Sequence, residues 1–222
     1  MLKLLESTGS SSNLTTFVYV IAGSAAFIFL FRAAIGYKGY KTSIFSYIYD
    51  NYLIDYFYKL NVFRDPSVSA KLKKKLGYHR LVYANIANKE GKLSAQIVTL
   101  IHGKGILSIA YLRNDGKLSG NDSGMWLIHR SENGQDKKYK IENPAIYLRE
   151  YNSHLHQVVA DHKIASAIAL SDDCDFSNVH CSFKVIHFSD LDDLFASSDC
   201  GYGLNESEIN EIFQKLGGKI SR

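Results

Sequence analysis

Side chains that bind metals or act as nucleophiles gather in the second half of this chain. Cys174 and Cys181 are separated by six residues, whereas structural zinc sites place two to four residues between paired cysteines. We therefore interpret the nearby histidines as surface residues and the cysteines as small, reduced, buried thiols. These histidines are His154, His156, His162 and His187. On this basis we expect no metal site and no cofactor.

Acidic residues form two short clusters that superficially resemble calcium loops. One is Asp172-Asp173 with Asp175, and the other is Asp190–Asp193. Neither has the glycine and the terminal glutamate of a calcium loop at the required spacing. The second cluster predicts the start of a short helix instead. The chain also has no glycine-rich phosphate loop and no nucleophile–histidine–acid arrangement that is recognisable from spacing, so no small-molecule substrate is evident.

The densest positive charge lies in the segment VSAKLKKKL, which predicts a helix. Asp65-Pro66 precedes it as a candidate N-cap and first helical residue, and Gly77 follows as its stop. Its lysines either form a solvated face or contact phosphates or anionic lipid together with Arg113. The formal net charge of +4 permits such contact without requiring it. The lysines are Lys71, Lys73, Lys74 and Lys75.

Residues 14–37 predict a transmembrane helix, because no charged residue occurs between Leu14 and Phe31. A buried core helix is the alternative. Basic residues Arg32, Lys38 and Lys41 follow the apolar run, and basic flanks normally stay in the cytoplasm. We therefore expect a single-pass protein of a bacterial inner membrane. Residues 1–13 would be a short outward-facing tail, with the C-terminal domain in the cytoplasm.

Residues 38–61 are rich in tyrosine and phenylalanine and predict a juxtamembrane helix. Asp50 and Asp55 interrupt the segment, which disfavours a second span. Tyrosine rings prefer sites with one apolar and one wet edge. The segment 44–58 therefore either lies along the inner leaflet or packs on the following domain.

Residues 62–222 predict an α/β domain with a mixed central sheet flanked by helices. Apolar runs bounded by Gly, Asn and Asp predict strands at 80–86, 95–102, 105–112, 125–130 and 182–188. His102-Gly103-Lys104-Gly105 predicts a tight turn that joins the second and third strands in a hairpin. Asn143-Pro144 predicts the start of a helix at 145–160, and a second amphipathic helix is predicted at 207–216.

The order of these motifs resembles the nuclease-related domain (NERD) family, a branch of the PD-(D/E)xK nuclease-like fold. The resemblance covers about residues 62–216, and members often carry one N-terminal membrane helix. The matching residues are Val82-Tyr83-Ala84-Asn85-Ile86, Gly91, Gln96-Ile97, Gly105-Ile106-Leu107-Ser108-Ile109, Gly116, Gly120, Trp126, Asn143-Pro144 and Val185-Ile186-His187-Phe188.

This resemblance implies a lost metal site. Phosphodiester cleavage in this fold needs carboxylates that hold Mg²⁺. The family's helix Glu falls at Asp65, its Asp at Val98, its strand Glu at Ala110 and its Lys at Leu112. Only Asp65 keeps a carboxylate, and strand alternation argues against Arg113 and Asp115 as relocated replacements. The resemblance therefore implies a degenerate, catalytically inactive nuclease domain.

Three functions remain open at this point. The first is a membrane-anchored scaffold or binding subunit of a bacterial envelope assembly, such as conjugation or type IV secretion, with other protein subunits as partners. The second is a nucleic-acid-binding module without cleavage, using the lysine run and Arg113. The third is an active Mg²⁺-dependent nuclease with relocated ligands that include Asp65 or Asp115.

Overall fold

The computed structural model describes residues 8–49, 65–87, 90–132, 134–159, 162–197 and 203–218. The chain divides into two compact units, Met1–Lys41 and Thr42–Arg222. We describe each unit by itself. The second unit begins before residue 62, where the sequence suggested that the domain starts.

The first unit contains the helix α1 (Thr8–Lys41), which runs beyond both ends of the expected span 14–37. Within the described part of the chain, Thr15–Lys41 is one helix long and apolar enough to cross a membrane. The side chains of Phe17, Ile21 and Phe27 are all more than half exposed. Exposed apolar surface of this kind is typical of a segment that contacts lipid or another protein.

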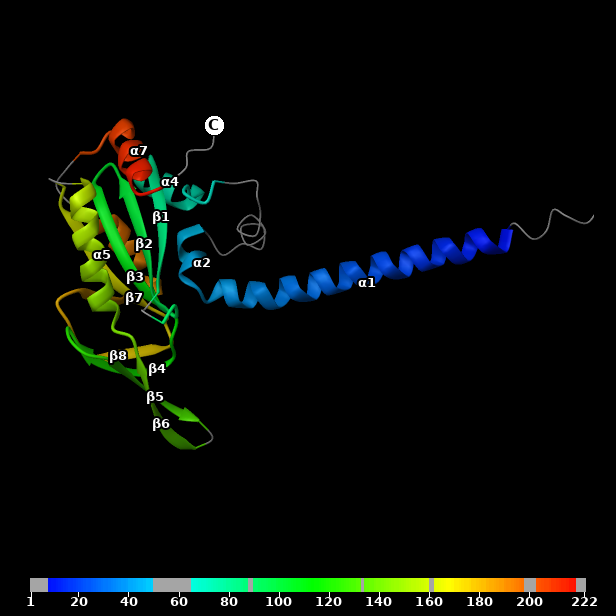
Figure 1. Ribbon diagram of the computed structural model, residues 1–222, viewed down its shortest axis with the longest axis horizontal. Helices are drawn as coiled ribbons and strands as arrows, with labels where there is room; N and C mark the ends of the chain where they lie inside the picture. Colours follow the sequence, from blue (N-terminus) through cyan, green and yellow to red (C-terminus); the bar gives the residue numbers. More distant parts are fainter. Residues whose placement is uncertain are drawn as a thin grey trace, which may run out of the picture. The chain divides into compact units, whose positions relative to one another are not determined.

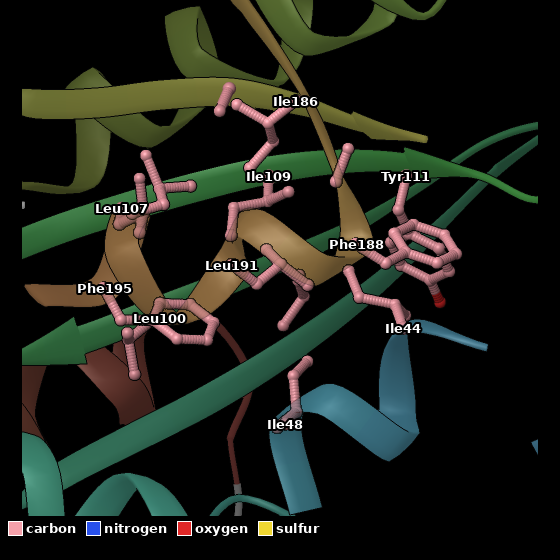
Figure 2. Packing of buried hydrophobic residues seen from close by; sticks show 14 of the residues in the cluster. Ile44, Ile48, Leu100, Leu107, Ile109, Tyr111, Ile186, Phe188, Leu191 and Phe195 are labelled. Atoms are coloured by element: carbon pink, nitrogen blue, oxygen red, sulfur yellow. The ribbon is translucent and has the colours of Figure 1, made fainter. Parts of the chain in front are cut away.

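The second unit begins with α2 (Ile44–Tyr49), which packs on the domain core. Ile44 and Ile48 are buried in a cluster with Leu191 and Phe188 (Figure 2). The hydroxyl groups of Tyr49 and Tyr83 lie 2.7 Å apart and share a hydrogen bond. For residues 44–49, packing on the domain is therefore the correct one of the two interpretations. Residues 50–64, the rest of the aromatic segment, lie outside the described residues.

A five-stranded mixed sheet forms the centre of the domain, in the order β1-β2-β3-β7-β9 (Figure 1). The strands β1 (His79–Ala87), β2 (Leu93–His102) and β3 (Gly105–Leu112) are antiparallel neighbours. His102 pairs with Gly105, which confirms the predicted hairpin. The strands β7 (Ile164–Leu170) and β9 (Lys184–His187) continue the sheet parallel to β3.

A second mixed sheet of four strands has the order β6-β5-β4-β8. It contains β4 (Gly116–Asn121), β5 (Trp126–Glu132), β6 (Gln135–Ile141) and β8 (Cys174–His180). The sequence predicted only β5 among these strands. In Figure 1 this sheet lies at one end of the domain, below α5, with the β5–β6 hairpin at its tip.

Helices cover both faces of the central sheet. One face packs against α2, α4 (Ala70–Leu76), the 3₁₀ turn η1 (Phe188–Asp190) and α6 (Leu191–Ser197). The other packs against α5 (Pro144–Val159), α7 (Glu206–Lys215) and the four-stranded sheet. The expected α/β class with a mixed sheet flanked by helices is therefore confirmed.

The start of α4 differs from the prediction, because Ser69 and not Asp65 is its N-cap. The Ser69 hydroxyl accepts a hydrogen bond from the backbone N–H of Leu72 and donates one to the carbonyl of Ile48. The Ser69 backbone N–H donates to Nε2 of the buried His79. Gly77, with a φ of 76°, ends the helix as predicted. Ser69 therefore ties α2, α4 and β1 together.

We expect His79 to make the fold less stable in mild acid. Nε2 of His79 accepts a hydrogen bond from the Ser69 backbone N–H, and Nδ1 lies 3.0 Å from the Gly77 carbonyl oxygen. The ring is therefore the neutral tautomer that carries its proton on Nδ1. Burial lowers the pKa of His79, and the positive charges of Arg80 and Lys73 lower it further. The hydrogen bond to Gly77 raises the pKa but does not outweigh these effects. The unfolded chain then binds the proton more tightly than the folded chain, so stability falls as pH drops below about 6.5.

Urea unfolding between about pH 7 and about pH 5 measures this effect. In a His79→Gln variant the loss of stability between these pH values should be smaller than in the wild type. An equal loss in both proteins would show that another group is responsible.

Candidate functional site

The β2–β3 hairpin carries the positions where the nuclease resemblance places metal ligands. Val98 is 1% exposed and belongs to the core cluster that packs against α2, α4 and α6. Ala110 is 0% exposed and belongs to the cluster with Ile97 and Trp126 on the other face. The cross-strand partner of Val98 is Ile109, and that of Ala110 is Ile97. Val98 and Ala110 therefore point to opposite sides of the sheet.

This geometry corrects the residue-by-residue assignment, since one metal ion could not contact both positions. Side chains alternate between faces along a strand, so a shift of one residue moves a position to the other face. On the face of Ala110, β2 offers Ile97 and Thr99 instead of Val98. The whole hairpin, residues 93–112, contains no Asp or Glu. Neither face of β2 and β3 can therefore supply a carboxylate ligand.

Leu112 ends β3 and packs, half-buried, against the same cluster as Ala110. The expectation that these two residues share a face is confirmed. Their neighbours in the cluster include Leu118, Ile128 and Leu148. This part of the sheet is filled by apolar packing beneath α5 and the four-stranded sheet.

Asp65, the remaining carboxylate of the expected set, is held by structural partners. Its Oδ1 accepts hydrogen bonds from the backbone N–H and hydroxyl of Ser67, at 2.9 and 2.6 Å. Its Oδ2 lies 2.8 Å from Nη1 of Arg80. Burial would raise the pKa of Asp65, but the bonds from Ser67 and the charge of Arg80 outweigh burial and lower it. Among the described residues no group of three or more His, Cys, Asp or Glu could hold a metal ion.

Asp115 and Arg113 lie in the connection between β3 and β4. Asp115 Oδ1 is 2.6 Å from Nη2 of Arg130, so it forms an ion pair with β5. Arg113 is exposed. The ion pair of Asp115 therefore links the β3–β4 connection to β5. Among the described residues, Asp115 and Asp65 do not belong to a common metal-binding group.

The four lysines of α4 fall into two pairs. Lys71 and Lys75 contact Asp192 of α6, at 3.2 and 2.8 Å, and Lys71 also donates to the carbonyl of Tyr47. Lys73 and Lys74 are exposed. The run therefore does not act as one surface, since half of it connects α4 to α6 and α2.

Gly120, Trp126 and Asn143, three of the residues on which the sequence resemblance rests, lie together where the four-stranded sheet meets α5. The carbonyl of Asn121 accepts hydrogen bonds from Trp126 Nε1 and Asn143 Nδ2, at 2.9 and 3.0 Å. Asn143 Oδ1 accepts from the backbone N–H of Ala145 and so caps α5. A Cβ atom at Gly120 would lie 2.2 Å from Trp126 Cδ1. Gly120, Trp126 and Asn143 thus fasten the four-stranded sheet to α5, and their role here is structural.

Sequence reasoning missed an open groove of about 610 Å³ beside this joint, between β8 and β9. Its walls include Phe176, Val179 and Phe183. Asp122 at its rim accepts hydrogen bonds from the backbone N–H and hydroxyl of Ser182, which lower its pKa, with a smaller contribution from Arg149. No spacing rule links Asp122 to Ser182, so only the fold reveals this contact.

The Cys181 thiol, which lines the groove, is not an activated nucleophile. Burial raises the pKa of the Cys181 thiol, whose Sγ donates to the carbonyl of Phe183 at 3.3 Å. A thiol with a raised pKa stays protonated at neutral pH and reacts poorly. The groove is an open surface with mixed polar and apolar walls, and it does not provide covalent chemistry at Cys181.

Comparison with known proteins yields no matching family model, no matching curated protein and no matching solved structure.

Proposed function

We propose that this chain is a single-pass protein of a bacterial inner membrane whose cytoplasmic, nuclease-like domain binds partners and does not cleave nucleic acid. It would serve as a scaffold or binding subunit of an envelope assembly, of the kind used in conjugation or type IV secretion. Its partners would be other protein subunits.

The helix α1 supports the membrane part of this proposal. It is long and apolar enough to span a bilayer, and its apolar side chains are exposed. Lys38 and Lys41 lie in its last turn, and basic residues favour the cytoplasmic side. The domain that follows Lys41 would then lie in the cytoplasm, with the N-terminus outside.

The order of elements supports the nuclease-like part. The resemblance expects a helix, strands, a tryptophan, a helix opened by Asn-Pro and a late strand. The described chain has α4, then β1 to β3, Trp126 in β5, α5 opening at Asn143-Pro144, and then β9. We therefore keep the NERD-like assignment, in the PD-(D/E)xK nuclease-like fold, as part of the proposal.

The observation that carries the non-cleaving function is the composition of the β2–β3 hairpin. Its residues include no carboxylate, and Val98 and Ala110 fill the core on opposite faces. Mg²⁺ at a scissile phosphate requires oxygen ligands, normally carboxylates. A domain without them in this hairpin is better suited to holding a partner than to hydrolysis.

The test uses the full chain purified in detergent after mild cross-linking in native membranes. We expect a stable complex with other envelope proteins and no cleavage of DNA or RNA with Mg²⁺ or Mn²⁺. A chain that purifies as a lone monomer would contradict the scaffold function. Metal-dependent cleavage that disappears in Asp115→Asn, or in Asp65→Asn while circular dichroism shows that the variant is folded, would instead show an active nuclease with relocated ligands.

A further inference from the structure

We propose that Lys73 and Lys74 of α4 bind the anionic lipid headgroups of the leaflet from which α1 emerges. Lys71 and Lys75, in the same run, serve the fold instead. This inference rests on the proposed function in one respect, that α1 spans a membrane.

The first step is the short connection between α1 and the domain. Only Thr42 and Ser43 separate the end of α1 from the start of α2, and two extended residues span at most about 7 Å. The six-residue helix α2 is itself only about 9 Å long. The connection between the end of α1 and the start of α2 is therefore short.

The second step is that α4 is attached directly to α2. The Ser69 hydroxyl, at the N-terminus of α4, donates to the carbonyl of Ile48 at 2.5 Å. Nζ of Lys71 donates to the carbonyl of Tyr47 at 2.7 Å. These two bonds link α4 to the backbone of the first domain element, so α4 lies beside the element that follows α1 in the chain.

The third step is the division of the lysine run by helix geometry. Lys71 and Lys75 are four residues apart, lie on one face, and both reach Asp192. Leu72 is buried in the core. Lys73 and Lys74 occupy the remaining surface, where their side chains are exposed and their ammonium groups form no hydrogen bond or ion pair with residues in the described ranges. Their charges are therefore available to an external anion.

Charge complementarity selects lipid as that anion. The basic end of α1, with Lys38 and Lys41, marks the side that faces the anionic cytoplasmic leaflet. A lysine near such a surface strengthens the association about fivefold, and the effect falls off within about 8 Å at physiological salt. Lys73 and Lys74 supply exposed positive charge on a helix that is bonded to α2, the element that follows α1 in the chain.

The experiment measures amide hydrogen exchange in α4 of the full chain. The protein is reconstituted into nanodiscs of phosphatidylcholine alone, or of phosphatidylcholine with a minor fraction of phosphatidylglycerol. We expect exchange across residues 70–77 to slow about tenfold or more in the anionic discs, and high salt to remove this protection. The double variant Lys73→Glu/Lys74→Glu should exchange equally fast in both discs, and Lys73→Gln/Lys74→Gln should show little protection.

A matched control reverses the same number of charges elsewhere. Lys138 and Lys140 are exposed residues of β6, which lies at the other end of the domain from α4 in Figure 1. The variant Lys138→Glu/Lys140→Glu should keep the lipid-dependent protection of α4.

Three results would overturn the inference. Equal exchange of wild-type α4 in both kinds of disc would show that the lysines do not contact headgroups. Protection by added duplex DNA in phosphatidylcholine discs, without protection by phosphatidylglycerol, would assign the lysines to nucleic acid. A chain that does not insert into discs would refute the membrane anchor as well, whereas an inserted chain with unprotected α4 would refute only this inference.

Discussion

Replacing Gly120 with alanine is expected to lower the free energy of unfolding by about 3 kcal/mol. The new Cβ would lie 2.2 Å from Cδ1 and 2.5 Å from Cγ of Trp126, far inside van der Waals contact. The indole cannot retreat easily, because Trp126 is 0% exposed and its Nε1 donates to the Asn121 carbonyl. Relief would require moving the joint between the four-stranded sheet and α5.

Chemical denaturation followed by circular dichroism measures this loss in the full chain. Gly103→Ala is the matched control, because its Cβ would meet only the carbonyl of Leu204 at an ordinary 3.6 Å. That variant should stay within about 0.5 kcal/mol of wild type. In the double variant Gly120→Ala/Trp126→Phe, the loss in free energy of unfolding should be smaller than the sum of the losses in the two single variants, because the smaller ring relieves the overlap. Strict additivity of the two changes would mean that steric overlap is not the cause.

The variant Asp65→Ala is expected to lower the free energy of unfolding by about 3 kcal/mol. The nuclease resemblance places this residue in an active site, but the structure gives it a structural partner. Arg80 is buried, and Asp65 is its charged partner at 2.8 Å. The guanidinium would remain in the protein with Ser67, Asn210 and Tyr78 as its neutral hydrogen-bond partners. A buried charge without its counter-ion is strongly unfavourable.

The double variant Asp65→Ala/Arg80→Met separates the ion pair from simple loss of packing. It leaves no unpaired charge, so its destabilisation should be smaller than the sum of the two single variants. Acid titration gives a second measurement. Because the pKa of Asp65 is lowered in the fold, its contribution is complete above the usual value of 3.8 and is lost as pH falls below it. A wild-type chain no more stable than Asp65→Ala at neutral pH would contradict the structural role.

Elements with clear boundary residues could be predicted from the sequence. The strand β3 has the predicted bounds Gly105–Leu112, with the His102–Gly105 turn before it. The helix α5 begins where Asn143-Pro144 indicates, because Asn143 caps it and proline suits its first position. The helix α7 begins after Asn205, whose side chain caps it in a capping box with Glu208. Local hydrogen bonds determine each of these boundaries.

Strands stabilised mainly by tertiary contacts could not be predicted. All residues of β6 except Ile141 are exposed and three are lysines, so the sequence has no apolar alternation there. Its pairing with β5 comes from a sheet whose inner face buries Leu118, Trp126 and Ile128. The strand β7, with the sequence IASAIAL, lies between β3 and β9, and its short side chains give a weak local signal.

The candidate site depended on strand register, which motif spacing alone does not determine. Placing Val98 and Ala110 at one metal required them to share a face, and the observed pairing of Ile97 with Ala110 excludes this. The start of α4 was misjudged for a related reason. Asp65 is a plausible N-cap by composition, but its distant partner Arg80 takes its carboxylate, and Ser69 caps the helix.

The placement of β7 between β3 and β9 also affects how the chain is made. The ribosome completes β3 well before β7, because residues 113–163 come between them. At about 5–20 residues per second this delay lasts roughly 3–10 s. During that time one edge of β3 has no neighbouring strand, and apolar side chains on both faces of the β2–β3 hairpin lack their cover. The hairpin is therefore exposed until β7 is synthesised, and we expect chaperones to bind it during translation.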